Sequence, residues 1–152
     1  AQAQLRARGV TTIAMANNAD CALLRETDYP IFLPTPAEVI SGSTRMGAGT
    51  AQKIALNMFS TLVGVRLGHV HDGMMVNLHA DNAKLQDRAR RMVTGITGCT
   101  SAQADDFLQQ AQGSVKIAAL LAAGAVNANA AGQLLDANRG KLRPSLEGLA
   151  LS

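Results

Sequence analysis

The stretch SGSTRMGAGTAQK, residues 41–53, brings hydroxyl side chains, small residues and two cations together directly before a long helical pattern. Small residues let the backbone approach a ligand closely, and free N–H groups at a helix start attract anions. Ser43 and Thr44, with backbone amides, are candidate donors to a phosphate or a sugar hydroxyl. Arg45 or Lys53 would supply positive charge. The alternative is a helix cap followed by small residues that allow tight packing, and residue types alone leave both interpretations open.

A second group of residues raises a metal hypothesis. Histidines and aspartates occur together in one connecting segment, with an H-x-H spacing: His69, His71, Asp72, His79 and Asp81. Histidines without a fixed helical spacing are more typical of loops or interfaces than of ligand sets. We therefore expect no metal here.

Composition excludes several classes of function. The 152 residues are 47% hydrophobic and only 3% aromatic, without Trp, so the core must be built from Ala, Leu, Val, Ile and Met, which favours helices. The net charge is +3, but the cations form no run apart from RARR at residues 88–91, and stacking aromatics are nearly absent. Both features argue against nucleic-acid binding.

Cysteine usage and hydropathy indicate a compartment. Cys21 and Cys99 are far apart and show no C-x-x-C spacing, so we expect two small buried side chains in a reducing environment, with no disulfide. No apolar run of about 18 residues is present, so we expect no membrane contact. Together these features predict a cytoplasmic location.

The elements that must position residues 41–53 alternate between helices and strands. A helix ending at Gly9 precedes strand 10–18, helix 19–28 and strand 29–36, the order of a parallel sheet with crossover helices. Two strands are too few for a stable sheet, so we expect further strands upstream, in a longer protein. Apolar residues cover most of the circumference of helix 48–67, which is therefore predicted to be buried. Shorter helices, each with a polar start and a Gly stop, follow at residues 82–98, 100–113, 114–124 and 126–140.

A family resemblance covers roughly residues 1–125. The run EVxxGSTRMxAGTAQK, at residues 38–53, resembles the signature of the N-acetylmuramic acid 6-phosphate etherases and of their relative, the glucokinase regulatory protein. The similarity continues collinearly through VRLG, MMVNLHADNAKL, RARRMVTGITGC and GSVKIAAL. These families contain sugar isomerase (SIS) domains. The resemblance thus implies an α/β fold: the C-terminal part of a SIS-type three-layer parallel-sheet sandwich, at residues 1–68, followed by a connection and a small all-α domain, at residues 69–152.

The resemblance also implies an activity. The family removes the D-lactyl ether of N-acetylmuramic acid 6-phosphate by eliminating lactate and adding water, without metal or organic cofactor. Its two acid/base glutamates lie in earlier strands, so we expect this chain alone to be inactive and the full-length protein to be a homodimer. A phosphorylated amino sugar is the expected partner. The substrate-binding residues expected here are Ser43, Thr44, Arg45, Thr50 and Lys53.

Two positions qualify this expectation. Glu38 stands five residues before Ser43, an offset that resembles the isomerase domain of glucosamine-6-phosphate synthase, so it is a candidate sugar contact or assisting carboxylate; the alternative is an ordinary acidic residue in a helix's first turn. Gly47 occupies a position where the family usually has Lys, which puts substrate affinity in doubt. A non-catalytic phosphosugar-binding regulator and a phosphosugar isomerase are the alternative functions.

Overall fold

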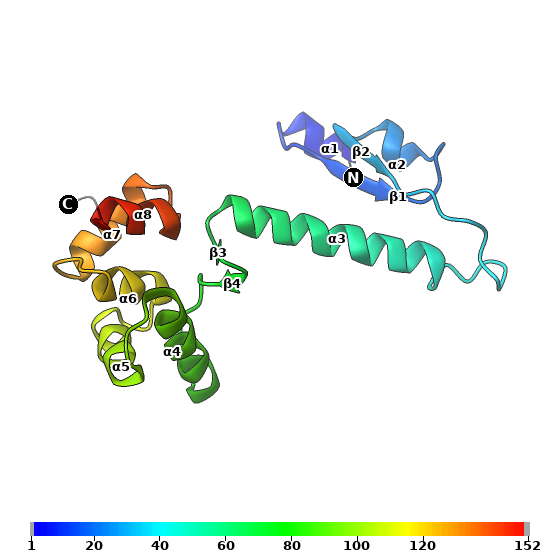
Figure 1. Cartoon of the computed structure of the whole chain (residues 1–152). Coiled ribbons are helices and arrows are strands. Elements are labelled where there is room, and N and C mark those ends of the chain that lie inside the picture. Colours follow the sequence, from blue (N-terminus) through cyan, green and yellow to red (C-terminus); the bar gives the residue numbers. More distant parts are fainter. Residues whose placement is uncertain (1, 151–152) are drawn as a thin grey trace. The chain divides into compact units, whose positions relative to one another are not determined.

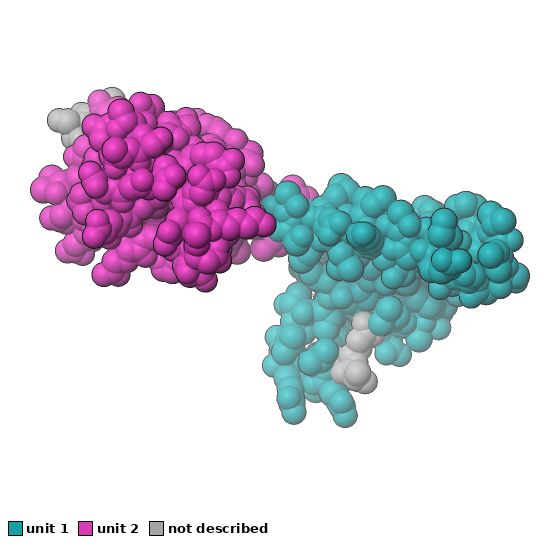
Figure 2. Space-filling model, turned by 90° about the horizontal axis from the view of Figure 1, so that it is seen from below, with its two compact units in different colours: residues 1–61 teal, residues 62–152 magenta. Residues whose placement is uncertain are grey.

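The computed structural model describes residues 2–150, and the chain divides into two compact units, residues 1–61 and 62–152 (Figures 1 and 2). Its described part is mixed α/β, with eight helices, one parallel pair of strands and one antiparallel pair. The α/β class is confirmed at this level, while the SIS-type sandwich and its boundary at residue 68 remain predictions. Among the described residues, no helix is long and apolar enough to cross a membrane.

The first unit is a small β-α-β arrangement. Helix α1 (Gln2–Ala7) is followed by Gly9, whose φ of +71° stops the helix. Strands β1 (Ile13–Ala16) and β2 (Tyr29–Phe32) pair in parallel, as predicted. In the observed register Ile13 lies opposite Tyr29. Helix α2 (Ala22–Arg25) forms the crossover, and its Leu24 is buried with Ala14 and Ala16 of β1.

A polar cluster, in which Thr12 and Thr27 are buried, holds the start of the two strands together. The backbone N–H and the hydroxyl of Thr12 both donate to Oδ2 of Asp28, at 2.8 and 2.7 Å. The Thr27 hydroxyl donates to the Thr12 carbonyl at 3.0 Å, and Arg6 forms an ion pair with Asp28 at 3.3 Å. These hydrogen bonds to the charged form lower the pKa of Asp28 below its ordinary 3.8, with a smaller contribution from Arg6.

Helix α3 (Gly47–Arg66) forms as predicted, but the prediction that it is buried is wrong for this chain. Its large apolar side chains are well exposed, including Met58 and Leu62, each at 60%, and only Gly64 is buried. The physical reason is a lack of partners: β1 and β2 contain four residues each, and no element of the described residues packs extensively against α3.

The second unit begins with a tight hairpin that the sequence analysis treated as an irregular connection. Strands β3 (Val70–His71) and β4 (Met74–Met75) are antiparallel and joined by Asp72 and Gly73. Both joining residues have positive φ, +46° and +75°, as a two-residue turn with an Asp-Gly sequence requires.

Five helices complete this unit, and the first four agree with the predicted ranges. They are α4 (Ala83–Thr97), α5 (Ser101–Gln110), α6 (Val115–Ala122), α7 (Ala128–Ala137) and α8 (Leu142–Ala150), the last of which was not anticipated. Helix α6 is central: it packs against α4, α5, α7 and α8, and its Leu120 is fully buried. Cys99, a free thiol, packs partly buried against this core, while Cys21 packs beside β1; neither is fully buried.

Candidate functional site

Polar side chains gather in the first unit where the two parallel strands end. Asn17 directly follows β1, and Thr35 lies three residues beyond β2. The Asn17 amide donates to the Leu33 carbonyl at 3.0 Å and to the Thr35 hydroxyl at 3.4 Å. Gln52, in α3, donates to the Asn17 side-chain oxygen at 2.6 Å. We call Asn17, Thr35 and Gln52 the strand-end network; it ties both strand ends to the first turns of α3.

This location is where open α/β sheets bind ligands, outside the carboxyl ends of the strands. An open depression of about 850 Å³ lies here, between the loops after β1 and β2 and the start of α3. The strand-end network contributes to its lining, as do Cys21, Glu38 and Thr44. In Figure 1 the long loop from β2 to α3, in cyan, carries the residues of the SGST stretch.

Glu38 occupies the helix start itself. The backbone N–H of Gly47 donates to both carboxylate oxygens at 3.0 Å, and that of Ala48 donates to Oε1 at 3.1 Å. The next amide, of Gly49, donates to the Thr44 carbonyl at 2.8 Å. The amides that the sequence analysis offered to an external anion are therefore used by the chain's own carboxylate and carbonyl groups. Glu38 also lies nine residues before α3 rather than in its first turn.

Small residues make this close approach possible. A Cβ atom on Gly47 would lie 3.3 Å from Oε1 of Glu38, and one on Gly49 would lie 3.2 Å from the Thr44 carbonyl oxygen. Both distances are tighter than ordinary van der Waals contact. The lack of a side chain at Gly47 and Gly49 therefore permits the contacts that cap α3.

The structure distributes the remaining expected site residues unevenly. Thr44 lines the depression, whereas Ser43, Arg45, Thr50 and Lys53 are not among its lining residues. Ser43 is half-buried, while Arg45, Thr50 and Lys53 are exposed around the start of α3. All of them lie within ten residues, along the chain, of Gly47 and Ala48, whose amides bind Glu38. The stretch thus surrounds the helix start, and two of its hydroxyl residues, Ser41 and Thr44, line the depression.

Asn17, Asn18, Thr35 and Gln52 line the depression but were missed as site residues. One signal was present in the sequence: the pair Asn17–Asn18 directly follows an apolar β-branched strand, where the carboxyl edge of a parallel sheet must lie. Gln52 carried no such signal, because its bond to Asn17 joins residues 35 positions apart.

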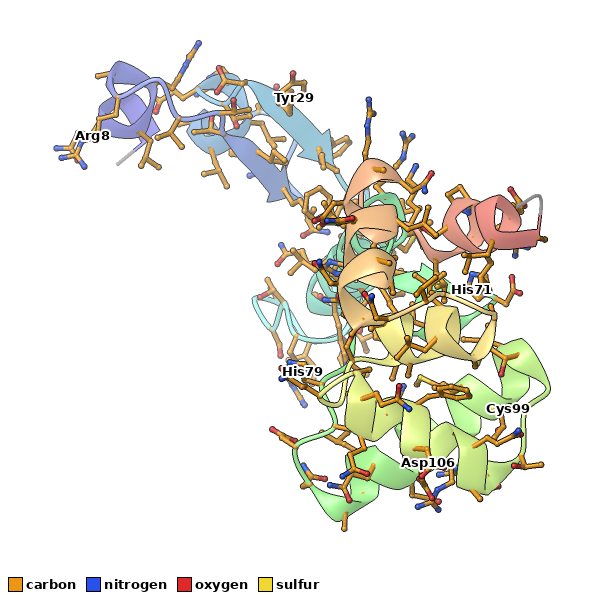
Figure 3. The ribbon with its side chains drawn as sticks, turned by 90° about the vertical axis from the view of Figure 1, so that its left-hand side faces the viewer. Arg8, Tyr29, His71, His79, Cys99 and Asp106 are labelled. Atoms are coloured by element: carbon orange, nitrogen blue, oxygen red, sulfur yellow. The ribbon has the colours of Figure 1, made fainter. Side chains whose placement is uncertain are left out.

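The histidines do not form a ligand set. His71 is buried and lies 3.5 Å from Oδ2 of Asp72, whereas His79 is exposed and pairs through its backbone with Ser114. Figure 3 labels these two histidines at separate places in the second unit. Within residues 2–150, no three His, Cys, Asp or Glu side chains come together as metal ligands would.

Comparison with known proteins gives the following. No family model matches the chain. It is 46% identical to the N-acetylmuramic acid 6-phosphate etherase of Deinococcus radiodurans over 147 residues, 96% of this chain and 48% of the relative. Proteins of the same name from Erwinia tasmaniensis and Streptomyces avermitilis are 44% and 41% identical, over 94% and 93% of this chain and 47% and 45% of each relative. The chain spans about half the length of the curated relatives it matches, and the matched half is the C-terminal one.

Proposed function

Because this chain is a homologue, over 93–96% of its length, of proteins named N-acetylmuramic acid 6-phosphate etherase, we propose that it forms the C-terminal half of such an enzyme. This homology is the observation that carries the proposal. The reaction is cleavage of the D-lactyl ether of N-acetylmuramic acid 6-phosphate to N-acetylglucosamine 6-phosphate and D-lactate. Lactate is eliminated across C2–C3 of the open-chain sugar, and water is then added.

The proposed chemistry divides the work between the two halves. A base must remove the proton next to the sugar aldehyde, and an acid must protonate the departing lactate oxygen. Two carboxylates whose pKa values are held apart suit this task near neutral pH. We assign them to the half of the enzyme that this chain does not span. By itself, therefore, this chain would bind at most part of the sugar and release no lactate.

The residues of this chain would hold the substrate. The strand-end network and the Thr44 hydroxyl offer hydrogen-bond donors and acceptors suited to sugar hydroxyls and the amide of an N-acetyl group. The first amides of α3 are occupied by Glu38, so the phosphate must find its charge complement in exposed side chains instead. We propose Arg45 and Lys53 for this role, with Ser43 and Thr50 as additional hydroxyl donors.

The main role proposed for Glu38 is to bind the backbone amides at the start of α3. Its two carboxylate oxygens are engaged by the amides of Gly47 and Ala48, so it positions the start of α3, and through α3 the side chain of Gln52. A sugar contact through a remaining lone pair of the same carboxylate is compatible with this role.

The exposed apolar side chains of α3 fit the same proposal. A helix that is apolar around most of its surface is normally covered on several sides. The matched relatives are about twice as long as this chain, so they contain enough further protein to cover such a helix. We propose that the other half of the enzyme packs there, in a cytoplasmic homodimer.

Reconstitution tests this function. This chain is co-expressed with the part of the D. radiodurans relative that lies outside the match, and D-lactate release from N-acetylmuramic acid 6-phosphate is measured. We expect release from the reconstituted complex and none from either half alone. Binding of the phosphosugar without lactate release would favour the regulator, and conversion between aldose and ketose phosphates would favour the isomerase; either result contradicts the proposal.

Variants of this chain refine the test. Thr44→Val keeps the shape of the side chain but removes its hydroxyl, and Lys53→Met removes one charge. Both should raise KM in the complex with little change in kcat, because they touch substrate and not the reacting bond. The matched control is Lys84→Met, an exposed residue of α4 in the other unit, which should leave KM unchanged.

A further inference from the structure

The helices of the second unit repeat at a fixed spacing along the chain. Helices α5 and α7 both contain 10 residues, and α7 begins at Ala128, 27 residues after α5 begins at Ser101. Helices α6 and α8 begin at Val115 and Leu142, again 27 residues apart. The pairs α5–α6 and α7–α8 are therefore in register with one another at a constant offset of 27.

Caps and burial follow the same offset. The N-cap side chains of Thr100 and Asn127 accept hydrogen bonds from the backbone N–H groups three residues later in each helix. Buried positions also correspond: Ala104 and Ala131 are both 0% exposed, Leu108 and Leu135 both 8%, and Ala118 and Ser145 both 0%. The two helix pairs therefore share these buried positions, although α6 buries more of its residues than α8 does.

The turns within the two pairs are the most specific correspondence. Gln112–Gly113 and Arg139–Gly140 both have two successive positive φ angles, +51° and +84° in one turn, +55° and +72° in the other. A positive φ is uncommon for residues other than glycine, and among the described residues only Asp72, Gln112 and Arg139 have one. Each turn is closed by the same bond, from the glycine N–H to the carbonyl five residues earlier, at 2.8 and 2.7 Å.

We infer that α5–α6 and α7–α8 are two copies of one helix–turn–helix motif, and that each glycine turn holds one end of the connector 67–80. We call the turn at Gly113 the first clasp and the turn at Gly140 the second clasp. The occupant in each case is a backbone segment of this same chain. This inference concerns the second unit alone and does not depend on the proposed reaction.

The first clasp holds the end of the connector. The carbonyl of Gly113 accepts a hydrogen bond from the backbone N–H of Ala80 at 3.3 Å, and His79 bridges to Ser114. A Cβ on Gly113 would lie 3.3 Å from the Ala80 nitrogen, so the absence of a side chain permits this approach.

The second clasp holds the beginning of the connector, where α3 ends. A Cβ on Gly68 would lie 2.8 Å from the Gly140 carbonyl oxygen and 3.1 Å from Cα of Lys141, so the two backbones are in direct contact. Gly68 itself has φ +71° and ends α3. The end of α3 therefore contacts the turn between α7 and α8 through two glycines, Gly68 and Gly140.

Equivalent cations secure the arrangement. Lys116 and Arg143 are the second residues of α6 and α8, 27 positions apart. The ammonium of Lys116 donates to the Gly140 carbonyl at 2.8 Å, and Arg143 forms an ion pair with Asp72 in the hairpin turn. The basic residue of each copy therefore binds a turn. Lys116, in the first copy, binds the second clasp, and Arg143, in the second copy, binds the hairpin turn in the middle of the connector.

Hydrogen exchange on the full chain tests the two clasps separately. Lys116→Met keeps an apolar stem but removes the donor to Gly140. Exchange of the Gly68 and His69 amides, which bond to Val65 and Gly64 in the last turn of α3, should become about tenfold faster, as expected for one lost charge-assisted bond. Exchange of the Ala80 amide, at the first clasp, should change less than about twofold.

A matched pair of variants tests what each glycine turn contacts. Asn tolerates the left-handed φ that both glycines adopt, so Gly113→Asn and Gly140→Asn should both fold. At residue 113 the new Cβ would crowd the Ala80 backbone, whereas at residue 140 its neighbours lie no closer than 3.8 Å. Gly113→Asn should therefore accelerate exchange at Ala80 and not at Gly68, and Gly140→Asn should accelerate neither. If Lys116→Met and Gly113→Asn accelerate the same amides together, or accelerate none, the two-clasp inference is wrong.

Discussion

The backbone N–H of Gly47 donates to both carboxylate oxygens of Glu38, at 3.0 Å each. A carboxylate at a helix start is favoured by the unpaired amides and by the helix dipole. Glu38 reaches this position from nine residues earlier in the chain, so it closes the loop 38–47 as well as capping α3.

Replacing Glu38 should loosen the start of α3. Glu38→Ala removes the acceptor for two amides and should lower the free energy of unfolding by about 1 kcal/mol. Glu38→Gln keeps one oxygen acceptor and should cost less. Exchange of the Gly47 and Ala48 amides reports the effect directly. Glu147→Ala, at an exposed position, is the control; an equal loss from both alanine variants would contradict the capping role.

Acid should weaken the first unit through Asp28. Its pKa is lowered from 3.8 by hydrogen bonds from Thr12, so the folded unit binds the proton less readily than the unfolded chain. The resulting stabilisation is present above pH 3.8 and is lost as the pH falls through the lower folded pKa. Fluorescence of Tyr29, the single tyrosine, can follow unfolding from about pH 6 to about pH 2. Asp28→Asn should flatten this dependence, and an unchanged profile would argue against the assignment.

Raising the pH should stabilise the second unit through Lys116. Burial lowers the pKa of Lys116 from its ordinary 10.5, so the unfolded chain binds the proton more tightly than the folded unit. Between the lowered pKa and 10.5 the free energy of unfolding should therefore rise with pH. The measurement is denaturant unfolding across this window in the parent and in Lys116→Met, whose difference isolates the contribution. Parallel curves would contradict the prediction.

Gly68 should not tolerate a side chain. Gly68→Ala must adopt a positive φ and place its Cβ 2.8 Å from the Gly140 oxygen. The expected cost is at least about 2 kcal/mol of unfolding free energy, measured by thermal or denaturant unfolding. Gly95→Ala is the control, because this glycine lies within α4 and no atom lies within 4 Å of its Cβ position. The control should gain about 0.5–1 kcal/mol; a comparable loss would show that glycine removal is generally harmful.

The exposed apolar surface of α3 should promote self-association of this chain. Met58→Gln and Leu62→Gln together remove two side chains that are each 60% exposed. Unfolding free energy should change by less than about 0.5 kcal/mol per substitution, whereas the sedimentation-averaged mass at high concentration should fall. Asn57→Gln on the same helix is the matched control. If self-association persisted unchanged, the surface responsible for it would lie elsewhere, and the prediction would be wrong.

Most elements could be predicted because local chemistry marks them. Gly9, Gly68 and Gly98 end helices with positive φ, and Thr100 and Ser114 begin helices with side-chain caps, so their positions follow from residue type. The hairpin at Asp72–Gly73 carried a strong local signal too, but strands of two residues are too short for periodicity to show.

What could not be predicted depends on contacts between distant residues. The sequence placed polar residues at the strand-to-helix junction, yet it could not show that Glu38 would fold back onto Gly47 and use the amides offered to a ligand. Gln52 meets Asn17 only because β1 and α3 are brought together by the fold. Periodicity correctly described α3 as apolar all round, but whether such a helix is covered depends on the partners available.

The bond between Lys116 and Gly140 also limits where this chain can be shortened. A fragment ending at Gly124 would retain α4, α5 and α6, which form a contiguous helical cluster. It would nevertheless remove the carbonyl acceptor of the Lys116 ammonium, and it would uncover the surface of α6 that packs on α7 and α8. An autonomous fragment of this unit must therefore start before Gly68 and extend through α8, so that both copies and the whole connector are expressed together.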